Sequence, residues 1–203
     1  MKKKRSFTEK ELKKLQNQAE EQQEKMRGGS LWRNFDFLVY ILIVLMLAFG
    51  LRRFVVEPIR VDGDSMHPTL IDNELMVVEK LAYWLNAPAR GDIVICFYPG
   101  YTESCVKRVV GLPGERVRVT GGRVYINDAP LAEGEYWNST IANDMEEITV
   151  PEENVFVMGD NRNYSKDSRS DEVGPIPYAE VVGRVHYIAW PVDRIRKLDR
   201  VAY

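Results

Sequence analysis

The sequence predicts a mostly β fold, with coiled antiparallel sheets or a barrel-like core, preceded by one apolar helix. Three observations lead to this prediction: a charge-free apolar run near the N-terminus, short Val- and Ile-rich segments after residue 56, and frequent Gly, Pro and Asp between those segments. The chain has 203 residues, which suits one domain of ordinary size with an appendage. Its net charge of −2 argues against a protein whose whole surface binds nucleic acid.

Residues 1–34 form a basic arm. Ten Lys or Arg against five Glu give this arm a net charge of +5, which leaves −7 for residues 35–203. Its polar pattern predicts a segment that is helical or disordered, followed by a break at Gly28, Gly29 and Ser30.

The apolar run covers residues 37–51, fifteen residues without a charge, and its apolar flanks extend it to about 20. We therefore predict a transmembrane helix over residues 35–56. A cleaved signal peptide fits poorly because 34 hydrophilic residues precede the run and two Arg follow it, and a buried core helix is the other alternative. The basic arm should stay cytoplasmic, which places residues 57–203 outside the cytoplasm in a single-pass protein of the cell membrane.

Nine later segments have the composition of strands. They are residues 55–61, 74–79, 92–98, 104–110, 115–119, 123–126, 147–150, 155–158 and 181–189. Residues 81–85 alone resemble a helical turn. Together they predict a β domain over residues 57–203.

A turn at residues 99–102 separates two of these strands and predicts a hairpin. If the hairpin is symmetric, Cys96 and Cys105 face each other. A cross-strand disulfide and a pair of reduced thiols are both compatible with this pattern.

The segment GDSMHPTL, residues 63–70, follows the first predicted strand. Its Ser65 lies between turn-forming residues, so its hydroxyl can project from a tight bend beside backbone N–H groups. A nucleophile with an oxyanion hole requires that geometry, although Gly-Asp-Ser is also a common turn.

The segment CVKRVVGLPGE, residues 105–115, holds Lys107 in a β-branched strand. Side chains alternate along a strand, so one of the neighbours Lys107 and Arg108 should face inward. An edge-strand Lys that discourages aggregation is the alternative. Burial disfavours the charged ammonium, so a buried Lys107 can accept the proton of Ser65, whereas the guanidinium of Arg108 cannot.

The segment GDNRNYSKDSR, residues 159–169, is unusually dense in Asp, Asn, Arg and Ser. By itself it fits a solvated turn or a cation loop, but it lacks the pattern of a calcium loop. His67 and His186 are the other candidate bases. A Ser–His arrangement looks strained because His67 shares the tight segment of Ser65, and we expect His186 to pack among Tyr187 and Trp190.

Taken together, these three segments resemble the boxes of the bacterial type I signal peptidases, the leader peptidase family. Their order, their spacing and the N-terminal apolar run all match, from about residue 35 to residue 191. The resemblance implies a mostly β catalytic core in the single-span form, with a short second lobe around residues 111–150. It implies a Ser–Lys dyad of Ser65 and Lys107, with Ser165 orienting the lysine amine and with Asp160, Asp167 and Arg169 supporting the site. Met66, Ile59 and Val61 are expected near the substrate pockets, and Gly63 replaces a residue that in some relatives donates a hydroxyl to the oxyanion.

The function implied is a membrane-anchored serine endopeptidase that removes N-terminal signal peptides from exported preproteins after small residues. No metal or organic cofactor is expected. Signal peptides of secretory preproteins and membrane lipid are the expected partners, the secretion machinery is a further candidate, and no nucleic acid is expected. Two alternatives remain: an inactive membrane-anchored β domain that binds exported chains, and a self-cleaving repressor-type peptidase with the same dyad.

Overall fold

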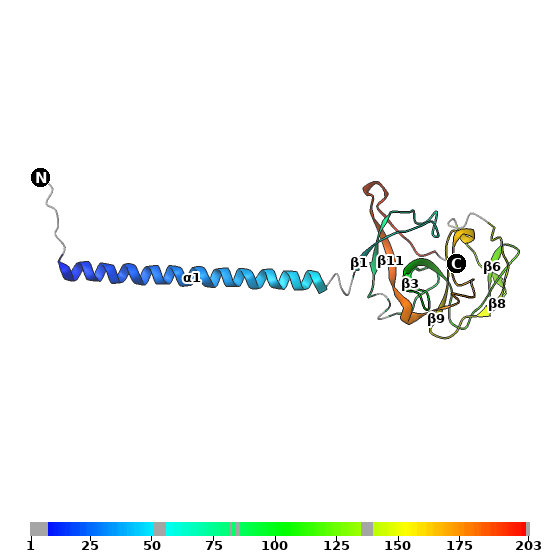
Figure 1. The fold of residues 1–203 in the computed structure, drawn as a ribbon, viewed down its shortest axis with the longest axis horizontal. Coiled ribbons are helices and arrows are strands. Elements are labelled where there is room, and N and C mark those ends of the chain that lie inside the picture. Colours follow the sequence, from blue (N-terminus) through cyan, green and yellow to red (C-terminus); the bar gives the residue numbers. More distant parts are fainter. Residues whose placement is uncertain (1–7, 51–55, 82, 84–85, 135–139, 202–203) are drawn as a thin grey trace. The chain divides into compact units, whose positions relative to one another are not determined.

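The computed structural model describes residues 8–50, 56–81, 83, 86–134 and 140–201, leaving aside the side chains of 24–34, 36 and 56. The chain divides into two compact units, Met1–Gly50 and Leu51–Tyr203. The first contains one long helix, and the second contains the strands (Figure 1). We describe each unit by itself.

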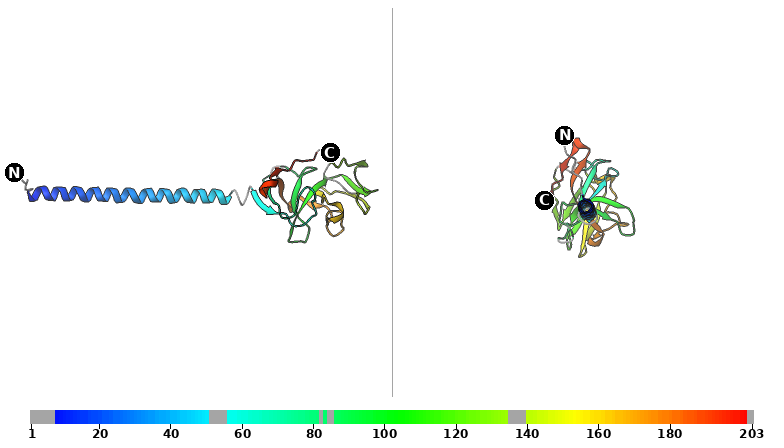
Figure 2. Two further views of the ribbon diagram at one scale, coloured as in Figure 1. Left: turned by 90° about the horizontal axis from the view of Figure 1, so that it is seen from above. Right: turned by 90° about the vertical axis from the view of Figure 1, so that its left-hand side faces the viewer.

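The helix α1 (Glu9–Gly50) has 42 residues. It begins with a capping box, because the Glu11 carboxylate accepts a hydrogen bond from the Thr8 N–H at 2.9 Å. The helix continues through Gly28, Gly29 and Ser30, and Figure 2 shows it as one uninterrupted coil. The predicted break at these residues is therefore wrong, since a glycine inside a helix costs only about 1 kcal/mol.

The C-terminal part of α1 carries the apolar run, with exposed side chains from residue 37 to residue 49. Within the described residues, no helix is both long and apolar enough to cross a membrane. The predicted transmembrane helix over residues 35–56 is not found in this description, and residues 51–55 of that prediction lie outside it.

The main sheet of the second unit has eight antiparallel strands in the order β1-β2-β11-β3-β4-β9-β10, with β12 paired to β11. These strands are β1 (Val56–Arg60), β2 (Leu75–Glu79), β3 (Ile93–Phe97), β4 (Ser104–Gly111), β9 (Asn154–Met158), β10 (Ile176–Pro177), β11 (Val181–Trp190) and β12 (Arg196–Lys197). Single 3-10 turns lie at Arg162–Tyr164, Tyr178–Glu180 and Val192–Arg194.

A second, four-stranded sheet has the order β7-β6-β5-β8. Its strands are β5 (Arg116–Thr120), β6 (Arg123–Ile126), β7 (Ala129–Pro130) and β8 (Met145–Thr149). The mostly β prediction is confirmed, since each of the nine predicted strands overlaps an observed one. The first residue of the first predicted strand, and most of the helical turn at residues 81–85, lie outside the described residues.

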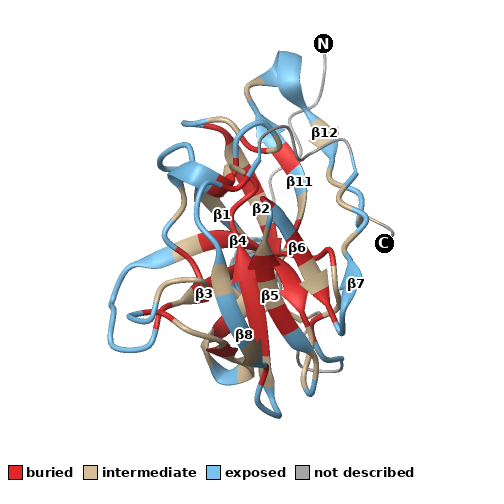
Figure 3. Cartoon of the chain, turned by 90° about the vertical axis from the view of Figure 1, so that its right-hand side faces the viewer, coloured by how far each residue is buried: buried red, intermediate tan, exposed pale blue. Residues whose placement is uncertain are grey.

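The core follows from strand alternation in the middle of the main sheet, where Figure 3 shows the strands as buried. One face of β3 and β4 packs Val94, Cys96 and Val109 against Val155 and Val157 of β9. The opposite face packs Ile93, Ile95 and Val106 against Met66, Leu70 and Met76. Phe156 and Met158 of β9 share a third cluster with Val117, Val119 and Val124 of the second sheet. Strand β4 is therefore covered on both faces.

Candidate active site

The loop between β1 and β2 presents Ser65. Gly63 begins the bend with a φ of 85°, a conformation that glycine adopts without strain, and its N–H donates to the Asp72 carboxylate at 2.9 Å. Met66 and Leu70 are buried beneath the loop and joined by a 3.0 Å backbone hydrogen bond. These contacts hold Ser65 partly exposed above an apolar base.

Lys107 of β4 meets Ser65 across the fold. Its Nζ lies 2.8 Å from the Ser65 Oγ and donates to the Val106 carbonyl at 2.9 Å. Lys107 is only 4% exposed, so its amine is almost completely desolvated. The structure thus brings together the two residues that the sequence predicts as nucleophile and base.

The expectation that only one of Lys107 and Arg108 faces inward is wrong, because both are buried. Arg108 is 1% exposed, and its guanidinium forms a bidentate pair with Asp160 at 2.8 and 2.7 Å. It also donates to the Gly91 carbonyl at 3.1 Å. Strand alternation still places the two side chains on opposite faces, but both faces of β4 are covered. A buried Arg requires a paired carboxylate, and Asp160 provides it.

Asp160 connects three segments of the chain. Besides its pair with Arg108 on β4, it accepts a hydrogen bond at 2.5 Å from the hydroxyl of Thr69, which belongs to the Ser65 loop. The predicted supporting residue Asp160 therefore ties the nucleophile loop and the lysine strand to the loop of residues 159–169.

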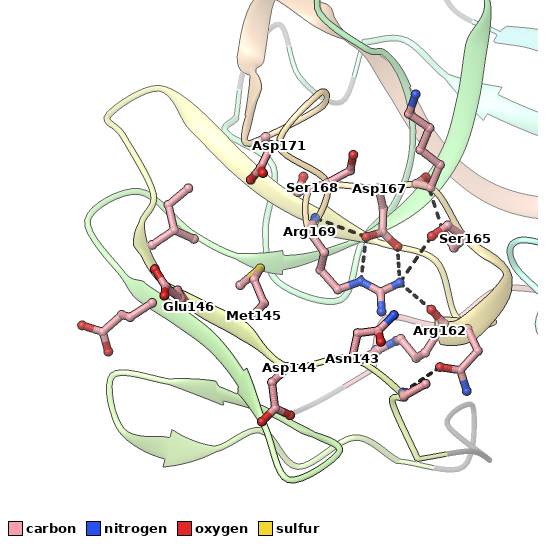
Figure 4. Close-up of a pocket in the computed structure, with 17 residues that line it drawn as sticks. Asn143, Asp144, Met145, Glu146, Arg162, Ser165, Asp167, Ser168, Arg169 and Asp171 are labelled. Atoms are coloured by element: carbon pink, nitrogen blue, oxygen red, sulfur yellow. Dashed lines mark hydrogen bonds and ion pairs between the residues drawn. The ribbon is translucent and has the colours of Figure 1, made fainter.

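Asp167 and Arg169 hold that loop in shape. Arg169 Nε and Nη2 donate to the two carboxylate oxygens of Asp167 at 2.8 and 2.9 Å, as the dashed lines in Figure 4 show. Arg169 also donates to the carbonyl of Arg162, and Asp167 accepts the Gly159 N–H at 2.9 Å. Asp167 is buried, so this network fixes the position of Gly159.

Gly159 is the point where Ser165 approaches the nucleophile loop. A Cβ added to Gly159 would lie 2.3 Å from the Ser165 Oγ and 2.4 Å from the Ser65 carbonyl oxygen. Only glycine leaves room for this contact. The hydroxyl of Ser165 donates to the Lys166 carbonyl at 3.4 Å, and its predicted role in orienting the Lys107 amine stays a prediction.

Asn161 is a residue that the sequence reasoning missed. Its backbone N–H donates to the Ser65 carbonyl at 3.1 Å, and its Nδ2 donates to the Asp64 carbonyl at 3.0 Å. It thereby holds the carbonyl groups of Asp64 and Ser65, which precede and follow the Ser65 nitrogen in the chain. The only signal in the sequence was its place in the GDN start of residues 159–169.

The three predicted pocket residues lie in one apolar cluster. Met66 and Val61 are 1% and 2% exposed, and Ile59 packs against the same cluster while partly exposed. Their role in binding substrate stays a prediction.

Neither histidine is placed to assist Ser65. His67 is exposed, and across the described ranges no hydrogen bond joins an imidazole to the Ser65 hydroxyl. His186 Nε2 lies 2.8 Å from a carboxylate oxygen of Glu79, and its ring is 6.2 Å from that of Tyr187. His186 therefore lies beside Tyr187, as expected, and also beside the Glu79 carboxylate of β2.

A cavity of about 820 Å³ lies beside this site, between β8 and the segment of residues 162–174 (Figure 4). Ser165, Asp167 and Arg169 line it, whereas Ser65 and Lys107 do not.

The chain is similar in sequence to proteins of one peptidase family. The family model for signal peptidase, peptidase S26, matches residues 34–190. The signal peptidase I of Leptolyngbya laminosa is 42% identical over 163 residues, which cover 76% of this chain and 78% of that protein. The signal peptidase I of Bacillus licheniformis is 36% identical over 174 residues, covering 81% and 93%. A crystal structure of a signal peptidase I from Enterococcus faecalis V583 aligns with a TM-score of 0.43 at 33% identity, covering 49% of this chain and 97% of that one. The chain therefore belongs to the signal peptidase family, peptidase S26, among the bacterial type I signal peptidases.

Proposed function

We propose that this chain is a serine endopeptidase that removes N-terminal signal peptides from exported preproteins, with Ser65 as nucleophile and Lys107 as general base. The observation that carries the proposal is the 2.8 Å separation between the Ser65 Oγ and a Lys107 Nζ that is shielded from water. Membership of the signal peptidase family supports the substrate class.

Lys107 is almost completely buried, and within the described residues no carboxylate forms an ion pair with its amine. The Val106 carbonyl accepts one N–H of the amine and so orients it towards Ser65. The amine takes the Ser65 proton as Oγ attacks the scissile carbonyl, and it then returns that proton to the leaving amine. Water hydrolyses the acyl-enzyme by the same proton route.

The developing oxyanion needs a hydrogen-bond donor close to Ser65. Among the described residues, the Ser65 N–H donates no hydrogen bond within the protein, so it is available for this role. Asn161 holds the carbonyl groups on both sides of this N–H and thereby keeps it in place. Gly63 has no side chain that can add a second donor.

The apolar cluster beneath Ser65 supports a preference for small substrate residues. Met66 and Val61 expose almost no surface, and Ile59 adds a partly exposed edge. We expect these side chains to form the base of shallow pockets, which would favour a methyl group over a long side chain.

The proposal is tested by comparing Ser65→Ala and Lys107→Met on a preprotein in detergent. Met keeps the length of the lysine side chain without its amine. Each change should lower kcat by about 10⁴-fold or more. Ser104→Ala and Lys197→Ala are matched controls on exposed positions, and they should process at the wild-type rate, as should His67→Ala. Processing retained by folded Lys107→Met would refute the dyad.

We place this enzyme at the cell membrane, with the basic arm in the cytoplasm and the β unit outside it. Supporting this, residues 37–49 expose apolar side chains around α1, and in the sequence Phe54, Val55 and Val56 follow the two arginines after the run. The net charge of +5 before the run supports the orientation.

Protease added to intact spheroplasts tests this topology. It should digest the β unit and leave an N-terminal fragment protected, and the full chain should resist extraction with carbonate. Digestion of the β unit only after lysis would reverse the orientation, and release by carbonate would show that the chain does not insert.

A further inference from the structure

The only two cysteines of the chain are register partners in the β3–β4 hairpin. The Cys96 and Cys105 sulfurs lie 3.5 Å apart, and both thiols are free. Cys105 Sγ also lies 3.4 Å from the Cys96 carbonyl oxygen. Since the strands already pair these residues, rotation of the side chains is enough to bring the sulfurs to bonding distance.

The two thiols have different environments. Cys96 is completely buried, whereas Cys105 is partly exposed. The hydrogen bond between them lowers the pKa of Cys105 to about 7, and the same contact with burial raises the pKa of Cys96 well above its ordinary value. Cys105 is thus the attacking thiol, because it is partly exposed and ionises more readily. Cys96 is the buried resolving thiol.

Cys105 lies two residues before Lys107, the candidate general base, on strand β4. Side chains alternate along β4, so Cys105 and Lys107 share a face. Beyond the thiols, the hairpin contacts Lys166 in the loop of residues 159–169: the Tyr98 hydroxyl donates to its carbonyl, and its Nζ lies 2.9 Å from the Tyr101 hydroxyl. Lys166 is the sequence neighbour of Ser165 and Asp167. The β3–β4 hairpin therefore carries both cysteines and Lys107 and also contacts the loop of residues 159–169.

We propose that Cys96 and Cys105 form a thiol–disulfide exchange site for small disulfides, and that the resulting bond clamps the β3–β4 hairpin beside the active site. The chemistry of the site does not depend on the proposed peptidase function. That function only gives the clamp its purpose, which is to hold Lys107 and the loop of residues 159–169 in register.

The exchange balances in two steps. The Cys105 thiolate attacks one sulfur of a low-molecular-weight disulfide, forming a mixed disulfide and releasing one thiolate. Cys96 then gives its proton to that thiolate and attacks the Cys105 sulfur, which releases the second thiolate. The second thiolate takes up the proton that Cys105 released when it ionised. In total, two protein thiols lose two electrons and two protons, and the small disulfide is reduced to two thiols.

The test uses the full chain in detergent with oxidised glutathione, with mass spectrometry and maleimide labelling as readouts. The wild type should lose two hydrogens and both labelling sites without dimerising. Cys96→Ser should instead trap one glutathionyl group on Cys105. Cys105→Ser should react at least about ten-fold more slowly, because Cys96 is buried and its thiolate is disfavoured. Alkylation of Cys105 in the reduced wild type should fall as the pH drops below about 7, since only the thiolate reacts.

A thermal-unfolding comparison tests the clamp. Oxidation should raise the Tm of the wild type by about 5–10 °C, the range expected for so short a loop, and should leave Cys96→Ser unchanged. Thiols that stay reduced in the folded wild type, or equal rates for the two Ser variants, would overturn the proposal. Ser65→Ala, which removes the proposed nucleophile, should oxidise like the wild type, so failure of the peptidase proposal is scored separately.

Discussion

The buried ion pair between Arg108 and Asp160 should be the most costly single contact to break in the β unit. Both side chains are almost completely buried, at 2% and 0% exposure, and two charge-assisted hydrogen bonds of 2.8 and 2.7 Å join them. Asp160→Ala leaves a buried guanidinium without its carboxylate, and the contacts that remain include the Gly91 carbonyl and the Thr69 hydroxyl. Removing one partner of such a pair lowers the free energy of unfolding by about 3–5 kcal/mol.

That loss should be visible as a shift in the thermal midpoint. For a unit of this size, each kcal/mol corresponds to about 2–4 °C, so Asp160→Ala should lower Tm by about 6–20 °C. Near-UV circular dichroism of the full chain in detergent measures this change. Glu147→Ala is the matched control, because Glu147 pairs with Arg116 at 3.1 Å on the surface and should cost less than about 1 kcal/mol.

A double variant separates the lost charge pair from the lost packing. Arg108→Met combined with Asp160→Ala removes both charges, so it should be more stable than Asp160→Ala alone. The reasoning is refuted if Asp160→Ala unfolds at the same temperature as Glu147→Ala, or if the double variant is the least stable of the set.

Three further changes test the site and its support. Gly159→Ala should lower kcat at least about ten-fold, because the new methyl group displaces the Ser165 hydroxyl and the Ser65 carbonyl oxygen, which lie within 2.4 Å of its position. Gly134→Ala is the control and should keep the wild-type kcat, because a methyl group there would lie 3.9 Å from the Val201 side chain. Asn161→Ala should lower kcat by about ten-fold with little change in KM, since it removes the Nδ2 hydrogen bond that holds the Asp64 carbonyl beside the nucleophile. A change in KM alone would contradict this role. For Glu74, burial would raise the pKa, but hydrogen bonds from Arg196 outweigh it and lower the pKa below 4.5. The ionised Glu74 therefore stabilises the fold at pH values above its ordinary pKa, and this stabilisation is lost as the pH falls towards the lowered pKa. In Glu74→Gln, which has no carboxylate to protonate, Tm should depend less on acidic pH.

Strand positions and one side-chain contact followed from local patterns. Alternating apolar residues placed the long strands, and the symmetric turn after Tyr98 correctly paired Cys96 with Cys105. These predictions succeeded because each depends on residues close together in the chain. Two-residue strands such as β10 have too few residues for a pattern, and they form only because β9 is already present to pair with them.

Long-range contacts explain what local patterns missed. The burial of Arg108 depends on Asp160, which lies 52 positions away, so nothing near Arg108 in the sequence shows that its charge is balanced. The role of Asn161 likewise depends on carbonyl groups 97 residues earlier. The predicted break at Gly28 and Gly29 failed for a different reason. Each glycine costs a helix only about 1 kcal/mol, which is too little to end one this long.

The hydrogen bonds of Asp160 also determine when, during synthesis of the chain, the candidate active site can form. Thr69 and Arg108 are synthesised first, but the carboxylate that joins them follows Ser65 by 95 positions (160 − 65). Closing so long a loop is slow, and only the completed tertiary structure repays its entropic cost. A nascent chain that ends before residue 160 therefore carries both Ser65 and Lys107 without the link that holds them in register. Activity should thus begin only when the β unit has folded as a whole, which protects the chain, and any neighbour, from premature cleavage during synthesis.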